Sequence, residues 1–293
     1  MCFECDEIDK GKRTFLKGAT AAFLGAALNS QTLGQQTASA TPKALDNPNI
    51  VHQAVTFQNG ADIIKGYLAR PKKNGRFRAV VVAQGNPGMP EDIRNAAAQM
   101  AELGYVGLAV DWNSRATGGD TNKLDKPLEF YINDAFNRQN MRDTQAAIDY
   151  LQMQSFVKPK KVGMLGFCGG GYLALRLATL SKDIKTVVAF YAPPLNDAAR
   201  TSPTDPRPDM IDFVGQVKVP AQYHFGTRDR VITLADIQKF EQKLKTEKAK
   251  AEIYLYEGAG HAFYDYTRPN LHNPAAAQLA YERMRDFLKK QLG

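Results

Sequence analysis

The arrangement of hydrophobic and polar positions changes along the chain. In residues 50–71 the two kinds alternate on either side of Asn59 and Gly60, which predicts a β-hairpin with a tight turn. Residues 77–85 read FRAVVVAQG, and such a continuous apolar run is typical of a strand that is covered on both faces. The chain therefore passes from an antiparallel hairpin into the buried part of a sheet.

Helical patterns separate the apolar runs that follow. The first helix is predicted at 90–104, where Pro90 stands at its start and Gly104 after its end. Further strands are predicted at 105–112, 161–167, 185–191, 220–226 and 251–258, and further helices at 134–154, 171–180, 233–247 and 274–292. Buried strands that alternate with amphipathic helices predict an α/β fold with a mostly parallel central sheet, an N-terminal antiparallel hairpin and helices on both faces.

The N-terminal segment has a different pattern. Basic residues precede a weakly apolar run at 19–28, and the segment ends in the small-residue motif ASA at 38–40, which is typical of a signal-cleavage site. Residues 12–17, KRTFLK, resemble a twin-arginine export motif with lysine in place of the first arginine. We predict a removable export signal at 1–40, a single domain at 41–293, and a periplasmic or secreted protein without stable membrane insertion. The alternative is an uncleaved amphipathic helix.

The composition is that of an ordinary globular protein. Of the 293 residues, 44% are hydrophobic and 23% are charged, which is enough for one sizeable core. Lys and Arg number 38 against 30 Asp and Glu, a formal charge of +8, but the basic residues are scattered. Because no arginine-rich run is interleaved with aromatic residues, we predict no nucleic-acid partner.

The chain has three cysteines, and two of them lie within the predicted signal. Cys2 and Cys5 form a C-x2-C pair, but no second pair exists to complete a zinc site, so we predict no metal. Cys168 would then be the one thiol of the mature protein. A lone thiol in an exported protein requires an explanation.

The surroundings of Cys168, GFCGGG, lie between a predicted strand and a predicted helix. Gly166 and Gly170 flank it at equal distance, which is the G-x-nucleophile-x-G pattern of a nucleophile elbow. Glycines relieve the crowding of so sharp a turn, and the first N–H groups of the helix that begins near Gly169 favour a thiolate. We therefore predict a nucleophile. A small buried core residue and a redox-active thiol are the alternatives.

A nucleophile of this kind needs an acid and a histidine, which follow it in that order in this architecture. Asp229 comes directly after the strand at 220–226 and His261 after the strand at 251–258, both at the sheet edge where Cys168 lies. His261 would share the thiol proton, and Asp229 would fix the tautomer of its ring. The rival histidines are His52, His224 and His272, and the rival acids are Asp111 and Asp265.

Three motifs in order, GFCGGG, GTRDRV and GAGHAF, resemble the dienelactone hydrolase family of α/β-hydrolases from about residue 51 to the C-terminus. The resemblance implies an α/β-hydrolase fold and a triad of Cys168, Asp229 and His261 that cleaves a small ester or lactone through an acyl-thioester, without a metal or organic cofactor. It also implies an oxyanion hole formed by the backbone N–H groups of Gly169 and Asn86. A non-catalytic binding protein on the same fold is a further alternative.

The sequence departs from the family pattern in two places. Gln84 and Gly85 stand where the family has the histidine and glutamate of its H-E-x-x-G loop, so thiol activation would depend on His261 and the helix end. The substrate-binding arginine soon after the histidine is missing, which argues against dienelactone itself as the substrate. The loop at 113–130 is a candidate lid. The candidate pocket residues are Trp112, Arg115, Tyr264 and Tyr266.

Overall fold

The computed structural model describes residues 43–85, 88–117, 134–158, 161–193 and 208–293, all within the unit Pro42–Gly293. The predicted export signal and Asn86 lie outside these residues, and so does most of the candidate lid. Among the helices of the described ranges, none is both long enough and apolar enough to cross a membrane.

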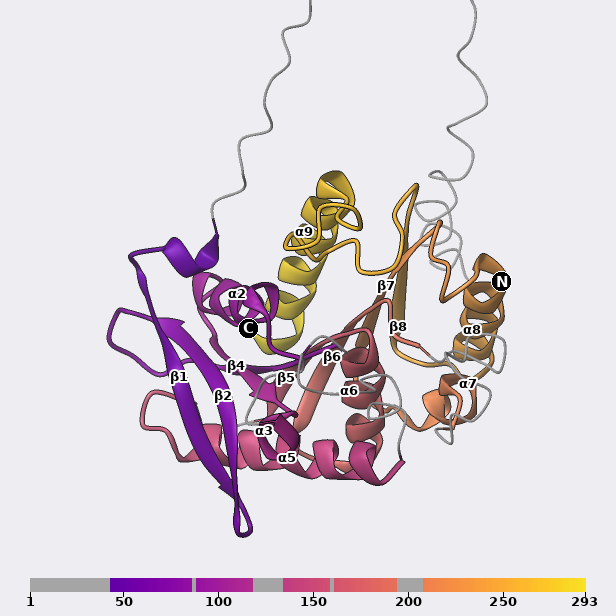
Figure 1. The fold of residues 1–293 in the computed structure, drawn as a ribbon. Helices are drawn as coiled ribbons and strands as arrows, with labels where there is room; N and C mark the ends of the chain where they lie inside the picture. Colours follow the sequence, from indigo (N-terminus) through magenta and orange to yellow (C-terminus); the bar gives the residue numbers. More distant parts are fainter. Residues whose placement is uncertain (1–42, 86–87, 118–133, 159–160, 194–207) are drawn as a thin grey trace, which may run out of the picture. The chain divides into compact units, whose positions relative to one another are not determined.

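An eight-stranded sheet runs through the described residues, in the order β1-β2-β4-β3-β5-β6-β7-β8 (Figure 1). The strands are β1 (Ile50–Asn59), β2 (Asp62–Pro71), β3 (Ala79–Ala83), β4 (Val106–Asp111), β5 (Val162–Phe167), β6 (Ile184–Phe190), β7 (Ala221–Gly226) and β8 (Ala251–Tyr256). β2 pairs antiparallel with β1 and β4, and the other neighbouring strands pair in parallel. The predicted sheet and its N-terminal hairpin are confirmed.

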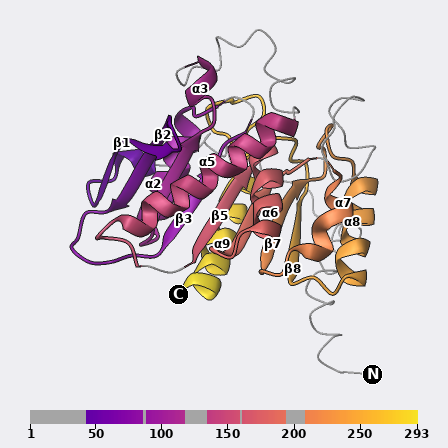
Figure 2. The same cartoon turned by 90° about the horizontal axis from the view of Figure 1, so that it is seen from below.

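Helices cover both faces of the sheet, as predicted. α2 (Glu91–Glu102) and α9 (Pro274–Leu292) lie on one face, and α5 (Asp134–Met153) and α6 (Gly169–Leu180) lie on the other (Figures 1 and 2). The remaining helical segments are α3 (Ser114–Thr117), α7 (Met210–Phe213), α8 (Leu234–Thr246), η1 (Ala44–Asp46) and η4 (Val214–Gln216). α8 packs on β7 through Phe240 and Tyr223, whose ring centroids are 5.2 Å apart.

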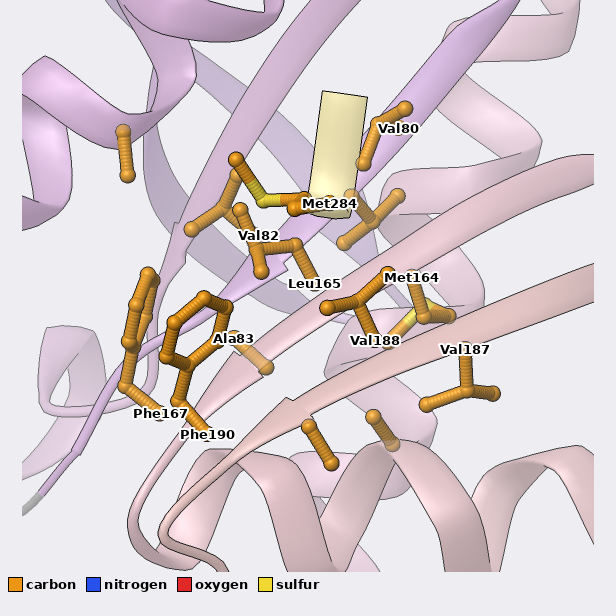
Figure 3. Packing of buried hydrophobic residues seen from close by; sticks show 14 of the residues in the cluster. Val80, Val82, Ala83, Met164, Leu165, Phe167, Val187, Val188, Phe190 and Met284 are labelled. Atoms are coloured by element: carbon orange, nitrogen blue, oxygen red, sulfur yellow. The ribbon is translucent and has the colours of Figure 1, made fainter. Parts of the chain in front are cut away.

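The central strands carry the core that fixes the position of the site. All residues of β3 and β5 are buried, as their unbroken apolar runs predict. Figure 3 shows their side chains with those of β6 and with Met284 of α9, and the rings of Phe167 and Phe190 lie 5.2 Å apart. Since each large buried side chain contributes about 1.5–3 kcal/mol, the strand ends are anchored by a large amount of apolar burial.

The backbone of the first turn of α6 packs closely against the end of β3. A Cβ atom on Gly170 would lie 2.3 Å from the carbonyl oxygen of Ala83 and 2.4 Å from that of Gln84. Both neighbours are backbone atoms, so no change of rotamer could make room for a side chain. Glycine at this position is therefore a condition for the observed approach of helix and strand.

The replacement Gly170→Ala should destabilise the protein, although alanine is a better helix former than glycine. We expect the free energy of unfolding, measured with denaturant, to fall by about 1–3 kcal/mol. Gly163→Ala in β5 is the matched control, because a Cβ there would meet only side-chain carbon atoms, the nearest at 3.0 Å. A Gly170→Ala variant as stable as the wild type would contradict the close contact.

Candidate active site

Cys168 lies at the sharp turn between β5 and α6. Its φ of 51° and ψ of −125° are outside the regions that residues with side chains normally adopt. The Cys168 N–H donates to the carbonyl oxygen of Phe190, 3.0 Å away at the end of β6. A Cβ on Gly166 would lie 2.4 Å from the carbonyl oxygen of Gly170. This strained turn, closed against glycines, has the geometry of a nucleophile elbow.

Asp229 lies in the turn after β7, and both of its carboxylate oxygens are used. One oxygen accepts hydrogen bonds from the backbone N–H groups of Val231 (2.7 Å) and Ile232 (3.0 Å). The other lies 2.8 Å from Nδ1 of His261, and the Asp229 side chain is 0% exposed. Because an ionised carboxylate can only accept, Nδ1 is the donor of that hydrogen bond, and Nε2 is left for another partner.

His261 lies in the turn after β8, and its Nε2 is 3.3 Å from Sγ of Cys168. This turn is tied to the turn that carries the acid. The Arg228 N–H donates to the carbonyl oxygen of Ala259 at 2.8 Å, and a Cβ on Gly226 would lie 2.2 Å from that same oxygen. The distance between the histidine and its acid is therefore fixed by backbone packing.

The charges of the site favour a thiolate paired with an imidazolium. Burial lowers the pKa of His261, but the negative charge of Cys168 and the hydrogen bond to Asp229 together outweigh it and raise that pKa from 6.5 to about 10. The first N–H groups of α6 add a favourable interaction with negative charge on the sulfur. Negative charge on the sulfur and the proton on His261 therefore stabilise each other.

The rival histidines hydrogen-bond elsewhere. His52 faces the hydroxyl of Tyr67 within the N-terminal hairpin. His224 is buried in β7 and faces the hydroxyl of Tyr256 at 2.7 Å. The third, His272, faces a backbone carbonyl oxygen at 3.1 Å. Of the four histidines, His261 is the one that the structure brings to Cys168.

The rival acids also have other partners. Asp111 accepts a hydrogen bond from the backbone N–H of Asn113, 3.0 Å away. Asp265 forms a 2.5 Å ion pair with Arg268. Asp229 alone among the three candidates is hydrogen-bonded to the histidine that faces the sulfur.

Only part of the predicted oxyanion hole falls within the described residues. Gly169 is the first residue of α6, where a backbone N–H has no acceptor within the helix. Asn86 lies outside the described residues. Gln84, two residues before it, is fully buried. With its amide oriented to donate, Gln84 reaches the carbonyl oxygens of Gly88 (3.3 Å) and Val110 (3.2 Å). The glutamine in the position of the family histidine thus links Gly88 to β4.

The four candidate pocket residues are engaged with the protein itself. Trp112 is 3% exposed and donates to Thr144, while Arg115 forms ion pairs with two aspartates. The hydroxyls of Tyr264 and Tyr266 donate to side chains of α2 at 3.0 and 3.1 Å. Each of the four thus has a side-chain partner within the protein.

Two residues near the site were not predicted from the sequence. Tyr191 directly follows β6 with a φ of 37°, and its ring centroid lies 5.0 Å from that of His261. Asp92 in α2 has a buried Oδ1 without a hydrogen-bond partner, and burial together with the charge of Asp265 raises its pKa to about 7. The position of Tyr191 at the end of the predicted strand 185–191 was a usable signal. Asp92 had none, because an acid in the first turn of a helix is common.

Known proteins resemble this chain over most of its length. A family model, the dienelactone hydrolase family, matches residues 64–292. A Bradyrhizobium protein provisionally named 2-oxo-3-(5-oxofuran-2-ylidene)propanoate lactonase is 32% identical over 227 residues, which cover 77% of this chain and 89% of that protein. A Methylorubrum extorquens protein provisionally named carboxymethylenebutenolidase is 26% identical over 276 residues, which cover 93% of this chain and 91% of that protein.

A solved structure supports the fold. The crystal structure of a protein from Klebsiella pneumoniae, provisionally identified as a dienelactone hydrolase, matches with a TM-score of 0.71. The match covers 80% of this chain and 96% of the other at 23% sequence identity. The agreement concerns the arrangement of strands and helices, and it accords with the parallel sheet and its covering helices.

The thiolate and imidazolium pair should make Cys168 reactive below the pH at which ordinary thiols react. We expect iodoacetamide to alkylate the wild-type protein at pH 6, and we expect the rate to fall about tenfold in Asp229→Asn, because the variant loses the interaction that helps keep His261 charged. Mass spectrometry of timed samples gives the rates. Asp149→Asn on the exposed side of α5 is the control. A wild-type rate that rises only near pH 8.5, as for a free cysteine, would contradict the pairing.

The raised pKa of Asp92 should make the stability of the fold depend on pH. The unfolded chain ionises Asp92 near pH 3.8, whereas the folded protein keeps the proton up to about pH 7. The folded state therefore binds more protons in this range, and it loses stability as the pH rises. Relative to the wild type, the free energy of unfolding of Asp92→Asn should rise by about 2 kcal/mol from pH 4 to pH 8. This is roughly half of the free energy that the full pKa shift corresponds to, because the side chain is partly exposed. Denaturant unfolding at both pH values measures this gain, and an equal effect at the two would argue against a neutral Asp92.

Proposed function

The chain belongs to the dienelactone hydrolase family and is a carboxylic ester hydrolase, and from this premise we propose that it acts through Cys168, Asp229 and His261 by way of an acyl-thioester. The observation that carries the proposal is the 3.3 Å separation of Nε2 from Sγ, with Nδ1 held 2.8 Å from a buried carboxylate. This arrangement combines proton-transfer reach with a fixed tautomer of the base.

In the first half of the reaction, the Cys168 thiolate attacks the carbonyl carbon of the ester, and the electron pair of the C=O bond moves to the oxygen. The backbone N–H of Gly169, together with that of Asn86, would stabilise this oxyanion. The intermediate then collapses, the carbon–oxygen bond to the leaving group breaks, and the alkoxide takes the proton from Nε2 of His261. An acyl-thioester and an alcohol result, and with a lactone the two remain in one molecule.

In the second half, the neutral His261 accepts a proton from water as the water oxygen attacks the thioester carbonyl carbon. Collapse of this second intermediate breaks the carbon–sulfur bond and releases the carboxylic acid. Cys168 returns as a thiolate beside a protonated imidazole, so the starting state is restored. Asp229 stays ionised throughout and stabilises the imidazolium.

The relatives favour a small ester or lactone as the substrate class. One is named as a lactonase and another as a carboxymethylenebutenolidase. In this chain Gly85 replaces the glutamate of the family loop, and the early substrate-binding arginine is missing. We therefore propose a lactone or ester other than dienelactone itself.

The proposal includes the place of the reaction. The basic segment, the weakly apolar run and the ASA motif at 38–40 support an export signal at 1–40 and a mature domain at 41–293. The hydrolase would then act in the periplasm or outside the cell. Cys168 would be its one cysteine after cleavage.

A redox-active thiol is the second candidate function, because a thiolate beside an imidazolium is also readily oxidised. Reversible oxidation to a disulfide needs a resolving thiol. Cys168 is the only cysteine of the described residues. Hydrolysis is therefore the function that this site supports better.

Cys168→Ala should abolish the hydrolysis of a small aryl ester while the fold stays intact. We expect kcat/KM to fall on the order of a thousandfold or more, because the covalent route is lost. Far-ultraviolet circular dichroism and the unfolding midpoint serve as controls of folding. Undiminished turnover by this variant would overturn the assignment.

Mass spectrometry separates the competing functions. A wild-type reaction quenched in acid should carry the acyl group of the ester on Cys168. A redox protein would show sulfenic acid after peroxide treatment and no acyl adduct. A binding protein on the same fold would bind the ester without turnover.

A further inference from the structure

A groove lies where α5 and α6 meet. Figures 1 and 2 show both helices on the same face of the sheet, with α6 near one end of α5. The volume of the groove is about 440 Å³, within the range of small-molecule sites. One stripe of each helix lines it. The stripes include Arg138, Met141 and Arg142 on α5, and Leu173, Arg176 and Leu177 on α6. On each helix these positions recur at the three- and four-residue spacing of one helix face, so one face of α5 and one face of α6 line the groove.

The floor of the groove is apolar. Leu173 and Leu177 are buried at 1% and 5% exposure. Leu180 at the C-terminal end of α6 lines the same groove and is 66% exposed, which is unusual for a large aliphatic side chain. Leu180 therefore gives the groove apolar surface that the described part of the protein does not cover.

The rim of the groove is positively charged. Arg142 donates a 2.8 Å hydrogen bond to the neutral amide of Gln139, and Arg176 lies over the ring of Phe213 with 4.8 Å to the centroid. Within the described ranges, neither of these guanidinium groups forms an ion pair with a carboxylate. Each guanidinium group has five N–H donors, so both keep donors that no carboxylate uses.

The acidic side chains near the groove accept hydrogen bonds from a neutral amide. Gln145, which lines the groove, donates from its amide to Asp149 at 3.0 Å and to Asp183 at 2.9 Å. No Asp or Glu belongs to the lining among the described residues. Arg142 and Arg176 line the same groove from neighbouring helices, so an anion bound at the rim would interact favourably with both positive charges.

The groove is separate from the triad. It extends along α6 from Tyr172 to Ser181, a length of about 14 Å at the rise of an α-helix. Cys168, Asp229 and His261 do not line it. A ligand there need not touch the reacting atoms.

We propose that this groove binds a small organic anion with an apolar chain, of which a medium-chain alkyl carboxylate is the representative class. The carboxylate would lie at the rim between Arg142 and Arg176, since guanidinium groups bind carboxylates through paired hydrogen bonds. The chain would lie along Met141 and Leu180, which line the groove and are not fully buried. The elongated shape, the apolar floor and the cationic rim together match a ligand with a charged head and a hydrocarbon tail.

Calorimetric titration with sodium decanoate tests the proposal. We expect one saturable site on the wild-type protein. Acetate lacks the chain and decyltrimethylammonium reverses the charge, so each should bind at least about tenfold more weakly. Equal binding of the cationic analogue, or the absence of saturable decanoate binding, would overturn the proposal.

Variants locate the binding. Arg142→Gln combined with Arg176→Gln should weaken decanoate binding at least about tenfold, because two charged donors are lost. Arg285→Gln combined with Lys289→Gln removes the same charge from the surface of α9 and should leave the affinity unchanged. Leu180→Glu, at a mostly exposed position, should weaken binding without unfolding the protein. Unchanged affinity in the Arg142 and Arg176 variant would place the binding elsewhere and refute the groove.

Two further measurements distinguish the groove from the triad and from a membrane-binding surface. The Arg142 and Arg176 variant should hydrolyse the aryl ester at the wild-type rate, so failure of the groove and failure of the triad give different results. Sedimentation with phosphatidylglycerol vesicles tests anionic lipid headgroups as the source of the anion. Vesicle binding that depends on the same arginines, without binding of free decanoate, would refute a small-molecule site.

Discussion

Backbone contact between loops at the carboxyl edge of the sheet fixes the distance between the sulfur and the imidazole. The turn of the acid and the turn of the histidine meet where Gly226 faces Ala259, and α6 meets β3 where Gly170 faces Ala83. Contacts between backbone atoms cannot be adjusted by rotamer changes, so they transmit position more rigidly than contacts between side chains do. The 3.3 Å separation of Nε2 from Sγ is a consequence of that rigidity. It explains why glycines recur at the ends of the strands that carry the site.

The electrostatic state of the site follows from the same packing. Asp229 is held by two backbone N–H groups and by His261, so its charge is satisfied although it is buried. That satisfied charge favours a protonated imidazole beside the sulfur, and in the proposed reaction little reorganisation would be needed when Cys168 attacks. The missing family glutamate is consistent with this arrangement, since the helix end and His261 already stabilise the negative sulfur. Tyr191, with its strained backbone, adds an aromatic wall against the imidazole.

The sequence was sufficient for the features that depend on local pattern and chain order. Apolar runs predicted the buried strands, the three motifs predicted the family, and the position of residues after strands predicted which side chains would meet. The helix predicted to begin near Gly169 does begin there, because the nucleophile-elbow pattern marks the turn between strand and helix. α3 and α7 were not predicted, since four residues are too few to show a helical period. Asp92 and the groove depend on which elements face one another in three dimensions, and no local pattern encodes that.

α6 links the triad to the groove, and its rigidity decides how the two could affect each other. Its first turn adjoins Cys168, the proposed nucleophile, and its flank forms one wall of the groove. Because Gly170 already lies against the backbone of β3, a ligand in the groove has little freedom to move the N-terminal end of the helix. Binding would therefore act mainly through mass action, by stabilising the folded state in proportion to ligand concentration. A change in catalytic rate would require α6 to adopt a second position, and the contact at Gly170 is the part of the structure that opposes one.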